Sequence, residues 1–266
     1  MPNVFSHHAS MLHNSKPNVV AIIPARLAST RFPRKVLADA TGKPLIAHVY
    51  ERAKLARTVS RVVIATDHAQ VLSAVHAFGG EAIMTSPSHP NGTSRLAQAA
   101  RDLSLAPADI VINVQGDEPE LDPAAIDAAV HALRTTNANV ATVASPIDNL
   151  ADFTNPAIVK VVLKRDGTAL YFSRANIPFD RDAQGELAPS KPLRHVGLYA
   201  YSAAYLQIYA ALEPTPLEST EMLEQLRVLE HGGSIAVAIH PCKGEGIDTP
   251  AQYAAFVARW KAANPS

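Results

Sequence analysis

Apolar residues follow two alternating patterns along the chain, short continuous runs and longer segments with helical spacing. The runs in the first half, at residues 18–25, 61–67, 81–84 and 109–119, are typical of strands buried on both faces of a parallel sheet. Alanine-rich segments with helix start or stop residues lie between them, and they predict helices at 43–59, 68–80 and 92–103. Strands that alternate with helices predict a mostly parallel central sheet, right-handed crossovers and helices on both faces.

The second half of the chain has a different pattern, because its apolar runs follow one another with little helix between them. Strand-like runs lie at 139–147, 157–164, 169–174 and 194–202, and they are followed by a predicted helix at 216–233, a strand at 234–240 and a helix at 249–263. We therefore expect one α/β domain over residues 19–266, with a smaller strand-rich subregion at about 137–200.

Composition narrows the possible functions. Residues 1–18 are interpreted as a disordered polar extension, histidines included, because they lack the apolar core of a signal peptide. No apolar run approaches the roughly 20 residues of a membrane span. The 24 basic and 24 acidic residues balance, so neither nucleic acid nor a membrane is an expected partner. The single cysteine, Cys242, excludes an intramolecular disulfide and fits a reducing compartment.

The first candidate site is the loop after the first strand, residues 26–35, where four cations fall within ten residues. Arg26, Arg31 and Lys35 can neutralise phosphate charge, and small residues nearby allow backbone amides to approach an anion. A solvated basic loop is the alternative, but the position directly after a buried strand favours a ligand. Neither G-x-x-x-x-G-K-[ST] nor G-x-G-x-x-G occurs, which argues against P-loop NTPases and ordinary dinucleotide dehydrogenases.

Carboxylates at the ends of two strands are the second candidate. Asp117 ends the run at 109–119 and could hold Mg²⁺, which prefers a few carboxylates together with phosphate oxygens. A helix N-cap is the alternative, and it suits Asp122, which stands directly before a proline. Asp248 precedes the last helix and by itself is more typical of a cap. Its interpretation as a metal ligand depends on the cationic loop and Asp117 being nearby.

A weaker signal lies in the strand at 194–202 and the helix at 216–233. His195, Tyr199 and Tyr201 share one face of the strand, but a buried histidine or tyrosine usually satisfies a hydrogen bond of the core. Charged residues on the helix have i, i+3 and i, i+4 spacing, which is also typical of surface ion pairs. The pattern alone leaves both interpretations open.

Together these stretches resemble the 3-deoxy-manno-octulosonate cytidylyltransferases, the CMP-KDO synthetase family, from about residue 19 to the end. IIPARLASTRFPRK is typical of sugar nucleotidyltransferases in general, whereas ALYFSRANIPFDRD, LRHVGLYAYS and PLESTEMLEQLRVLEHG are much narrower. The resemblance implies a GT-A-like nucleotidyltransferase fold and a Mg²⁺-dependent reaction of CTP with 3-deoxy-D-manno-octulosonate (Kdo), giving CMP-Kdo and diphosphate. It also implies a cytoplasmic homodimer that serves lipopolysaccharide biosynthesis, with the strand-rich subregion as a dimer contact.

The same resemblance implies roles for individual residues. Lys35 and Arg26 would act in catalysis together with Asp117 and Asp248, which would also hold the metal. The residues implied in CTP binding are Pro24, Ala25, Arg26, Arg31, Lys35, Asn91, Gly92 and Arg95. Those implied in Kdo binding are Gln115, His195, Tyr199, Glu224 and Gln225.

The chain departs from the family pattern at two positions. Arg34 stands where a glycine is common, which puts the shape of the loop in question. Ser94 stands where an acidic residue is usual, so an ion pair from that position to Arg95 is missing. A CMP-sialic acid synthetase or a hexose-1-phosphate nucleotidyltransferase would share the opening loop. A non-catalytic nucleotide-binding regulator would keep the loop without both carboxylates.

Overall fold

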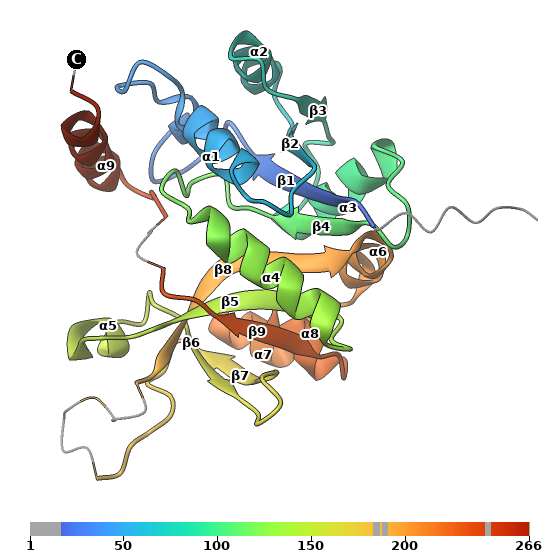
Figure 1. Cartoon of the computed structure of the whole chain (residues 1–266), viewed down its shortest axis with the longest axis vertical. Coiled ribbons are helices and arrows are strands. Elements are labelled where there is room, and N and C mark those ends of the chain that lie inside the picture. The colour runs from blue at the N-terminus through green and yellow to red at the C-terminus, as the bar shows by residue number, and fades with distance from the viewer. Residues whose placement is uncertain (1–16, 183–186, 188–190, 243–245, 266) are drawn as a thin grey trace, which may run out of the picture.

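The computed structural model describes residues 17–182, 187, 191–242 and 246–265, so most of the predicted N-terminal extension lies outside the described residues (Figure 1). The first half forms a parallel sheet in the order β3-β2-β1-β4. Its strands are β1 (Val19–Ala25), β2 (Arg61–Thr66), β3 (Ala82–Met84) and β4 (Ile110–Asn113). The parallel arrangement confirms the prediction from alternating strands and helices.

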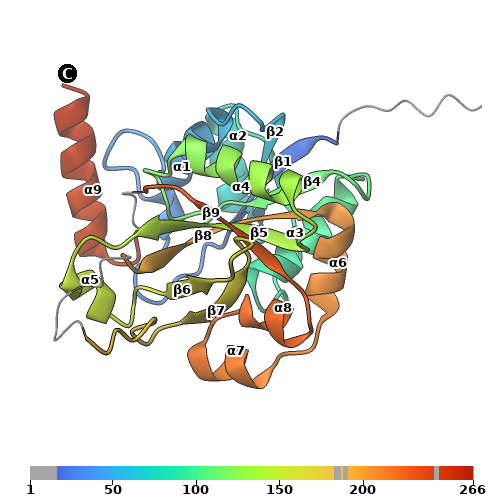
Figure 2. The ribbon, with the colours of Figure 1, turned by 60° about the horizontal axis from the view of Figure 1, so that its bottom comes forward.

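The second half extends the same sheet with strands of mixed direction. β8 (Leu193–Ser202) lies antiparallel between β4 and β5 (Val140–Pro146), and β9 (Ile235–Ile239) lies parallel to β5 at the edge. The hairpin of β6 (Lys160–Leu163) and β7 (Ala169–Ser173) leaves this path and pairs with β8 through β6 (Figure 2). The strand-rich subregion is therefore continuous with the central sheet.

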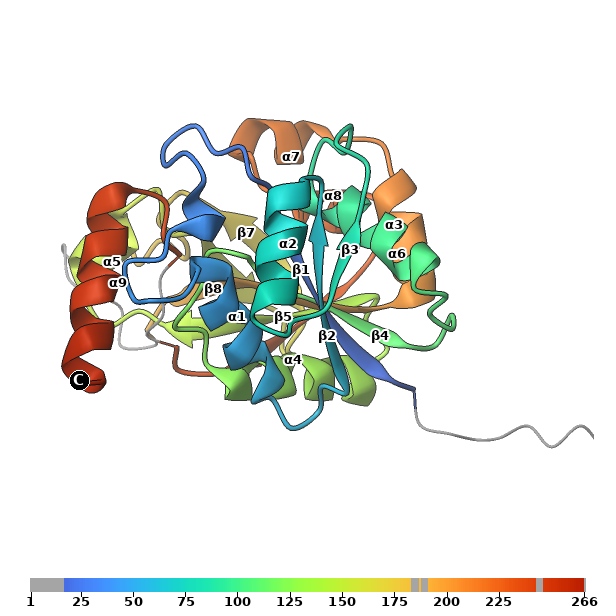
Figure 3. The ribbon, with the colours of Figure 1, turned by 90° about the horizontal axis from the view of Figure 1, so that it is seen from above.

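Helices cover both faces of the sheet (Figure 3). α1 (Leu45–Lys54), α2 (Ala69–Ala77) and α4 (Pro123–Thr135) pack on one face. α3 (Gly92–Asp102), α6 (Ala203–Ala211) and α8 (Leu226–Glu230) pack on the other. The remaining helices are α5 (Leu150–Thr154), α7 (Pro216–Glu221), α9 (Pro250–Ala263) and the 3₁₀ helix η1 (Lys35–Leu37). None of the helices in the described residues is long and apolar enough to cross a membrane.

The residues of β1 show why the strand is uniformly apolar. Ala21 and Ile23 pack into the core cluster on the α1 face, whereas Val20 and Ile22 pack into the cluster on the α3 face. Because side chains alternate along a strand and both faces are covered, every position must be apolar. Polar residues return only where the strand ends, which places the cationic loop at the carboxyl edge of the sheet.

The predicted helix at 43–59 is too long, because α1 ends at Lys54. The carboxylate of Asp127 accepts the backbone N–H of Arg57 at 3.2 Å and that of Thr58 at 2.8 Å. These bonds from α4 fix the chain in a turn and compete with the helical bonds that would continue α1.

The predicted helix at 216–233 is also wrong as a single helix, since it divides into α7 and α8 at Met222. Met222 has a left-handed backbone with φ of 53°, which a continuous α-helix cannot contain. Arg227 reaches across the break and donates to Glu218 at 2.6 and 2.7 Å, so this ion pair does not have the i, i+3 or i, i+4 spacing of a continuous helix. Helix α6 was not predicted at all, although Ser202 caps it by accepting from the backbone N–H of Tyr205.

His48 on α1 provides a pH-dependent part of stability. Its Nε2 lies 2.7 Å from Thr41 Oγ1, its ring meets those of Phe256 and Trp260 edge-on, and burial lowers the pKa of His48 to about 4. The unfolded chain therefore binds a proton at pH 5 that the folded chain does not, so stability is lost as pH falls from about 6.5 toward 4.

The unfolding free energy of both wild type and His48→Gln should fall between pH 7.5 and pH 5. We expect the fall in His48→Gln to be about 1–2 kcal/mol smaller, because the variant lacks the buried imidazole. Urea titrations at the two pH values measure this difference. His76→Gln, at an exposed position of α2, is the control and should keep the wild-type change. An equal loss in His48→Gln and wild type would remove His48 as the cause.

Candidate active site

The loops after β1 and β4 lie against each other at the carboxyl edge of the sheet, where open α/β sheets bind ligands. Gly116 permits this contact, because a Cβ added there would lie 2.7 Å from the backbone oxygen of Pro24. The two loops enclose a cavity of about 350 Å³. It is lined by Pro24, Arg26, Ala28, Ser29, Thr30, Arg31, Lys35, Val36, Gln115, Gly116 and Asp117. The cavity thus joins the cationic loop to the first predicted carboxylate.

Lys35 is the centre of charge in this site. Its Nζ lies 2.8 Å from Asp117 Oδ2 and 3.2 Å from Asp248 Oδ1, although these residues are 82 and 213 positions away in the chain. The lysine side chain is 11% exposed, whereas those of the aspartates are 30% and 41% exposed. The two carboxylates therefore share one nearly buried cation and keep oxygens open toward solvent.

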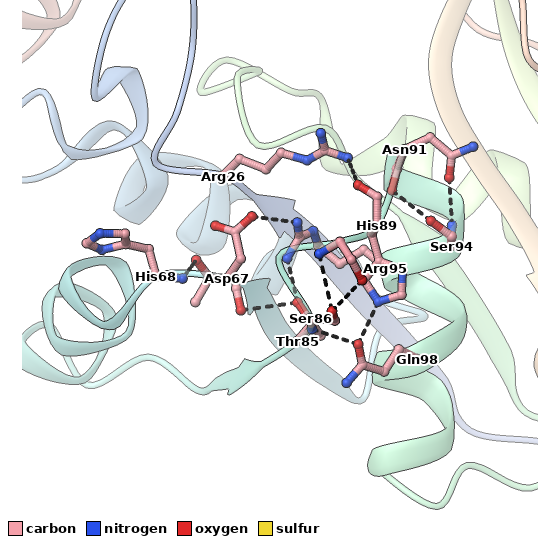
Figure 4. Close-up of polar contacts among 12 residues, drawn as sticks. Arg26, Asp67, His68, Thr85, Ser86, His89, Asn91, Ser94, Arg95 and Gln98 are labelled. Carbon is pink, nitrogen blue, oxygen red and sulfur yellow. Dashed lines mark hydrogen bonds and ion pairs between the residues drawn. The ribbon is translucent and has the colours of Figure 1, made fainter.

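The two arginines of the loop are held differently. Arg31 donates to Asp248 Oδ2 at 3.0 Å and is largely exposed, so it stays at the edge of the carboxylate pair. Arg26 donates to the backbone oxygen of His89 at 2.9 Å, which joins the cationic loop to the loop before α3 (Figure 4). The structure thus brings Arg26, Arg31 and Lys35 around one cavity, as predicted from their position after β1.

Arg34 has a left-handed backbone with φ of 58°, which explains why glycine suits this position. Its guanidinium donates to Gln70 Oε1 at 3.2 Å in an exposed contact. Arg34 therefore connects the loop to α2 and strains the turn that leads into Lys35.

We expect Arg34→Gly to unfold with a free energy about 1 kcal/mol higher than that of Arg34→Ala, because only glycine relieves the left-handed strain. Both variants lose the contact with Gln70, so the comparison isolates the backbone. Urea unfolding of the pair measures it. Equal stability would mean that the turn has relaxed to another conformation in the alanine variant.

Arg95 is fully buried, in contrast to Arg26 and Arg31, the other two arginines implied in CTP binding. It donates to Asp67 Oδ2 and to Thr85 Oγ1, each at 2.6 Å (Figure 4). Burial lowers the pKa of the Arg95 guanidinium, which Asp67 partly offsets, and its Nε lacks a hydrogen-bond partner in the described residues. Asp67, at the end of β2, therefore provides the ion pair that Ser94 cannot, and Arg95 belongs to the wall of the site.

Asn91 and Gly92 form the start of α3 beside β1. Asn91 caps the helix by accepting from the backbone N–H of Ser94 at 2.9 Å. A Cβ at Gly92 would contact the ring of Pro24 at 3.6 Å, so the helix start lies against the end of β1. These residues therefore lie on the same side of the cationic loop as His89.

The residues implied in Kdo binding gather along β8. Gln115 donates to the backbone oxygen of Gly197 at 3.1 Å, and the rings of His195 and Tyr199 lie 5.3 Å apart. Burial lowers the pKa of His195 to about 3, so its ring is neutral at pH 7 and lies 3.0 Å from Thr142 Oγ1. Burial and the charge of Glu224 raise the pKa of Tyr199, which keeps the phenol neutral.

Glu224 and Gln225 lie between α7 and α8. Burial raises the pKa of Glu224, and a hydrogen bond from Thr93 at the start of α3 partly offsets this. Gln225 is 4% exposed, and its Nε2 lacks a hydrogen-bond partner in the part of the chain that the structure describes. A buried amide without a partner is unusual and is a natural donor to a ligand.

The donor set at Asp117 and Asp248 fits a magnesium ion. Two half-buried carboxylates already converge on one cation, and Mg²⁺ is commonly bound by one or two carboxylates plus substrate phosphates. Groups of three or more His, Cys, Asp or Glu that could hold a metal are absent from the described residues. Two carboxylates fit a metal that phosphate oxygens help to bind.

Three residues of the site were not predicted from the sequence. Asp67 could have been found, because it ends a buried strand as Asp117 nearly does. Glu118 is next to Asp117, and burial together with that neighbour raises the pKa of Glu118 to about 7, so at neutral pH it adds less than a full charge. Thr142 becomes important only through β5–β8 pairing, which no local pattern indicates.

Comparisons with known proteins agree with this geometry. The model of the Cytidylyltransferase family matches residues 20–235. A 3-deoxy-manno-octulosonate cytidylyltransferase of Syntrophobacter fumaroxidans is 52% identical over 240 residues, covering 90% of this chain and 95% of the relative. One of Herminiimonas arsenicoxydans is 51% identical over 235 residues, covering 86% and 93%.

Solved structures give the same result. CMP:2-keto-3-deoxy-manno-octonic acid synthetase complexed with CTP superposes with a TM-score of 0.86 at 40% identity, covering 92% of this chain and 99% of the other. A 4-diphosphocytidyl-2C-methyl-D-erythritol synthase, at 12% identity and a TM-score of 0.62 over 92% of this chain and 98% of the other, shares the fold alone.

The fold and these matches define a nucleotidyltransferase, and the chain belongs to the cytidylyltransferase family. Within that family it groups with the 3-deoxy-manno-octulosonate cytidylyltransferases. The predicted family and the predicted nucleotidyltransferase fold are confirmed. The family match ends at residue 235, before Asp248 and α9.

Proposed function

We propose that the protein activates Kdo: CTP and Kdo react to give CMP-Kdo and diphosphate, which serves lipopolysaccharide biosynthesis. The names of relatives at 48–52% identity and the CTP-bound structural neighbour support this activity. The observation that carries the proposal is the meeting of Lys35 with Asp117 and Asp248 at the mouth of a cavity lined by Arg26 and Arg31.

The reaction is an in-line displacement at the α-phosphorus of CTP. The anomeric hydroxyl oxygen of Kdo bonds to phosphorus, the bond from phosphorus to the bridging oxygen breaks, diphosphate leaves, and the hydroxyl proton passes to solvent. Lys35 and Arg31 turn from the carboxylates to the triphosphate when CTP binds. There they and Arg26 stabilise the charge that grows in the transition state.

Asp117 and Asp248 are the residues that would hold Mg²⁺. When bound, the ion lowers the pKa of the attacking hydroxyl and neutralises phosphate charge. The two carboxylates come from loops that are far apart in the sequence, so both loops must be in place before the site is complete.

The sugar pocket is formed by Gln115, His195, Tyr199, Glu224 and Gln225. A neutral His195 and a neutral Tyr199 offer hydrogen bonds to sugar hydroxyls without introducing charge. The unpaired Nε2 of Gln225 offers a donor that a sugar oxygen would satisfy. On the nucleotide side, the start of α3 and the end of β1 face the cytidine.

A diphosphate-release assay tests the proposal. The protein is incubated with CTP, Mg²⁺ and either Kdo, sialic acid or mannose 1-phosphate, and with EDTA as the metal-free control. We expect release with Kdo, at least 10²-fold less with the other sugars, and none with EDTA. Release with another sugar alone would replace Kdo as the substrate. No release with any sugar would leave a nucleotide-binding regulator as the function.

The cytoplasm and a homodimer belong to the same proposal. The β6–β7 hairpin, which branches from the main strand order through β8, and the exposed Leu170 on it support the strand-rich subregion as the contact. Sedimentation equilibrium would give twice the chain mass of 28.4 kDa, and Leu170→Glu should shift it toward the monomer. An unchanged dimer in that variant would place the contact elsewhere.

A further inference from the structure

Helix α9 begins directly after Asp248 and fixes the backbone of that residue. Gln252 Oε1 accepts the backbone N–H of Asp248 at 2.8 Å and that of Thr249 at 3.0 Å, as in a capping box. Just before it, the backbone N–H of Ile247 donates to the backbone oxygen of Asp117 at 2.8 Å. The segment that carries Asp248 is therefore bound to Asp117 on one side and to α9 on the other.

One turn further along α9, Tyr253 contacts both flanks of η1, the 3₁₀ helix that begins with Lys35. Its ring centroid lies 5.4 Å from that of Phe32, and its hydroxyl accepts the backbone N–H of Ala40 at 2.8 Å. Phe32 in turn accepts the backbone N–H of Lys35 at 3.2 Å. Tyr253 therefore touches the chain both before and after the lysine that meets the two carboxylates.

Packing of the main core does not account for this contact. α9 lies at the edge of the molecule beside α1 (Figures 1 and 3), and Phe256 is its buried residue. Phe256 packs with Leu45 and Ile247 in a small cluster separate from the two large ones. Tyr253 lies at the rim of that cluster, on the side of the cationic loop.

We propose that Tyr253 is a positioning residue for nucleotidyl transfer, because it holds the Lys35 turn against the helix that follows Asp248. One side chain thus sets the distance between the cation and both carboxylates. This inference goes beyond the proposed function, which assigns α9 no role, and its kinetic test rests on that function. We call the contacts of Tyr253 with Phe32 and Ala40 the clasp. Since a shift of about 1 Å in a reacting group can cost 10²-fold in rate, we expect the clasp to matter more for turnover than for folding.

Three variants separate positioning from packing. Tyr253→Phe removes the bond to Ala40 and keeps the ring, whereas Tyr253→Leu removes both contacts. Tyr50→Phe is the matched control, because the Tyr50 hydroxyl also accepts a backbone N–H, from Glu81 at 3.3 Å, away from the site. Thermal unfolding of all three is measured first, so that kinetic changes are compared at known stability.

In the diphosphate-release assay we expect kcat to fall about 3–10-fold in Tyr253→Phe and about 10²-fold in Tyr253→Leu. The KM for CTP should change less than kcat, because the loop is needed most in the transition state. Tyr50→Phe should keep the wild-type kcat even if it unfolds at a lower temperature. Wild-type kcat in Tyr253→Leu, or an equal loss in Tyr50→Phe, would overturn the proposal.

A second measurement needs no substrate. Trypsin can cut after Arg31, Arg34 and Lys35, and mass spectrometry identifies those cuts. We expect them to form several-fold faster in Tyr253→Leu than in wild type or Tyr50→Phe, because the loop is no longer held. Unchanged rates of these cuts would refute the clasp. If wild type shows no activity with Kdo, the proposed function fails, yet the tryptic result still decides on the clasp.

Discussion

Replacing Asp117 by asparagine is expected to lower kcat by about 10²–10³-fold while the fold is retained. The substitution keeps the shape of the side chain and removes its charge. Asp117 contacts Lys35 at 2.8 Å and keeps part of its carboxylate open to the cavity, so the charge serves both the lysine and an incoming metal. An amide oxygen can accept from Lys35 but cannot hold a divalent cation equally well.

The measurement is diphosphate release at saturating CTP and Kdo over a series of Mg²⁺ concentrations. Asp166→Asn is the control, because Asp166 lies in an exposed turn and bonds only its neighbour Thr168 in the described structure. Circular dichroism verifies that both variants are folded. Near wild-type turnover of Asp117→Asn at saturating Mg²⁺ would show that the metal assignment is wrong.

The sheet could be predicted from the sequence, whereas the interruptions of helices could not. Strands β1, β2 and β4 are continuous apolar runs because both of their faces are covered, and this pattern is local. The end of α1 depends on a distant partner, since the carboxylate of Asp127 accepts the backbone N–H of Thr58. The left-handed Met222 between α7 and α8 has no sequence signature, because methionine is an ordinary helix former.

The residues of the candidate site also divide into those that a local pattern indicates and those that only the fold brings in. The cations after β1 and Asp117 after β4 are found by their position, because parallel strands end at the same edge. Asp248 has no such signal, and only the fold brings it within 3.2 Å of Lys35. Arg95 is buried and paired with Asp67 because α3 packs next to the end of β2 in the fold. The sequence therefore indicated Arg95 as a site residue but could not predict its burial or its partner.

Lys35→Met is expected to reduce kcat by about 10²–10³-fold and, at the same time, to lower the Mg²⁺ concentration needed for half-maximal rate. In the structure the ammonium group of Lys35 contacts both Asp117 and Asp248, the residues proposed to hold the metal. Lysine and metal therefore compete for the same oxygens. Methionine fills the volume of the lysine stem and removes the competitor, so the carboxylates become a better metal site and a poorer catalyst.

A lower kcat combined with a lower Mg²⁺ requirement distinguishes Lys35 from a residue that merely supports the fold. Partial unfolding would lower kcat and also weaken Mg²⁺ binding. Lys43→Met is the matched control, since Lys43 forms an ion pair with Glu51 at the surface, where such pairs contribute little. It should leave kcat and the Mg²⁺ dependence unchanged. If Lys35→Met instead required more Mg²⁺ than wild type, the lysine would be assisting metal binding, and the exchange of Lys35 from carboxylates to phosphate would have to be abandoned.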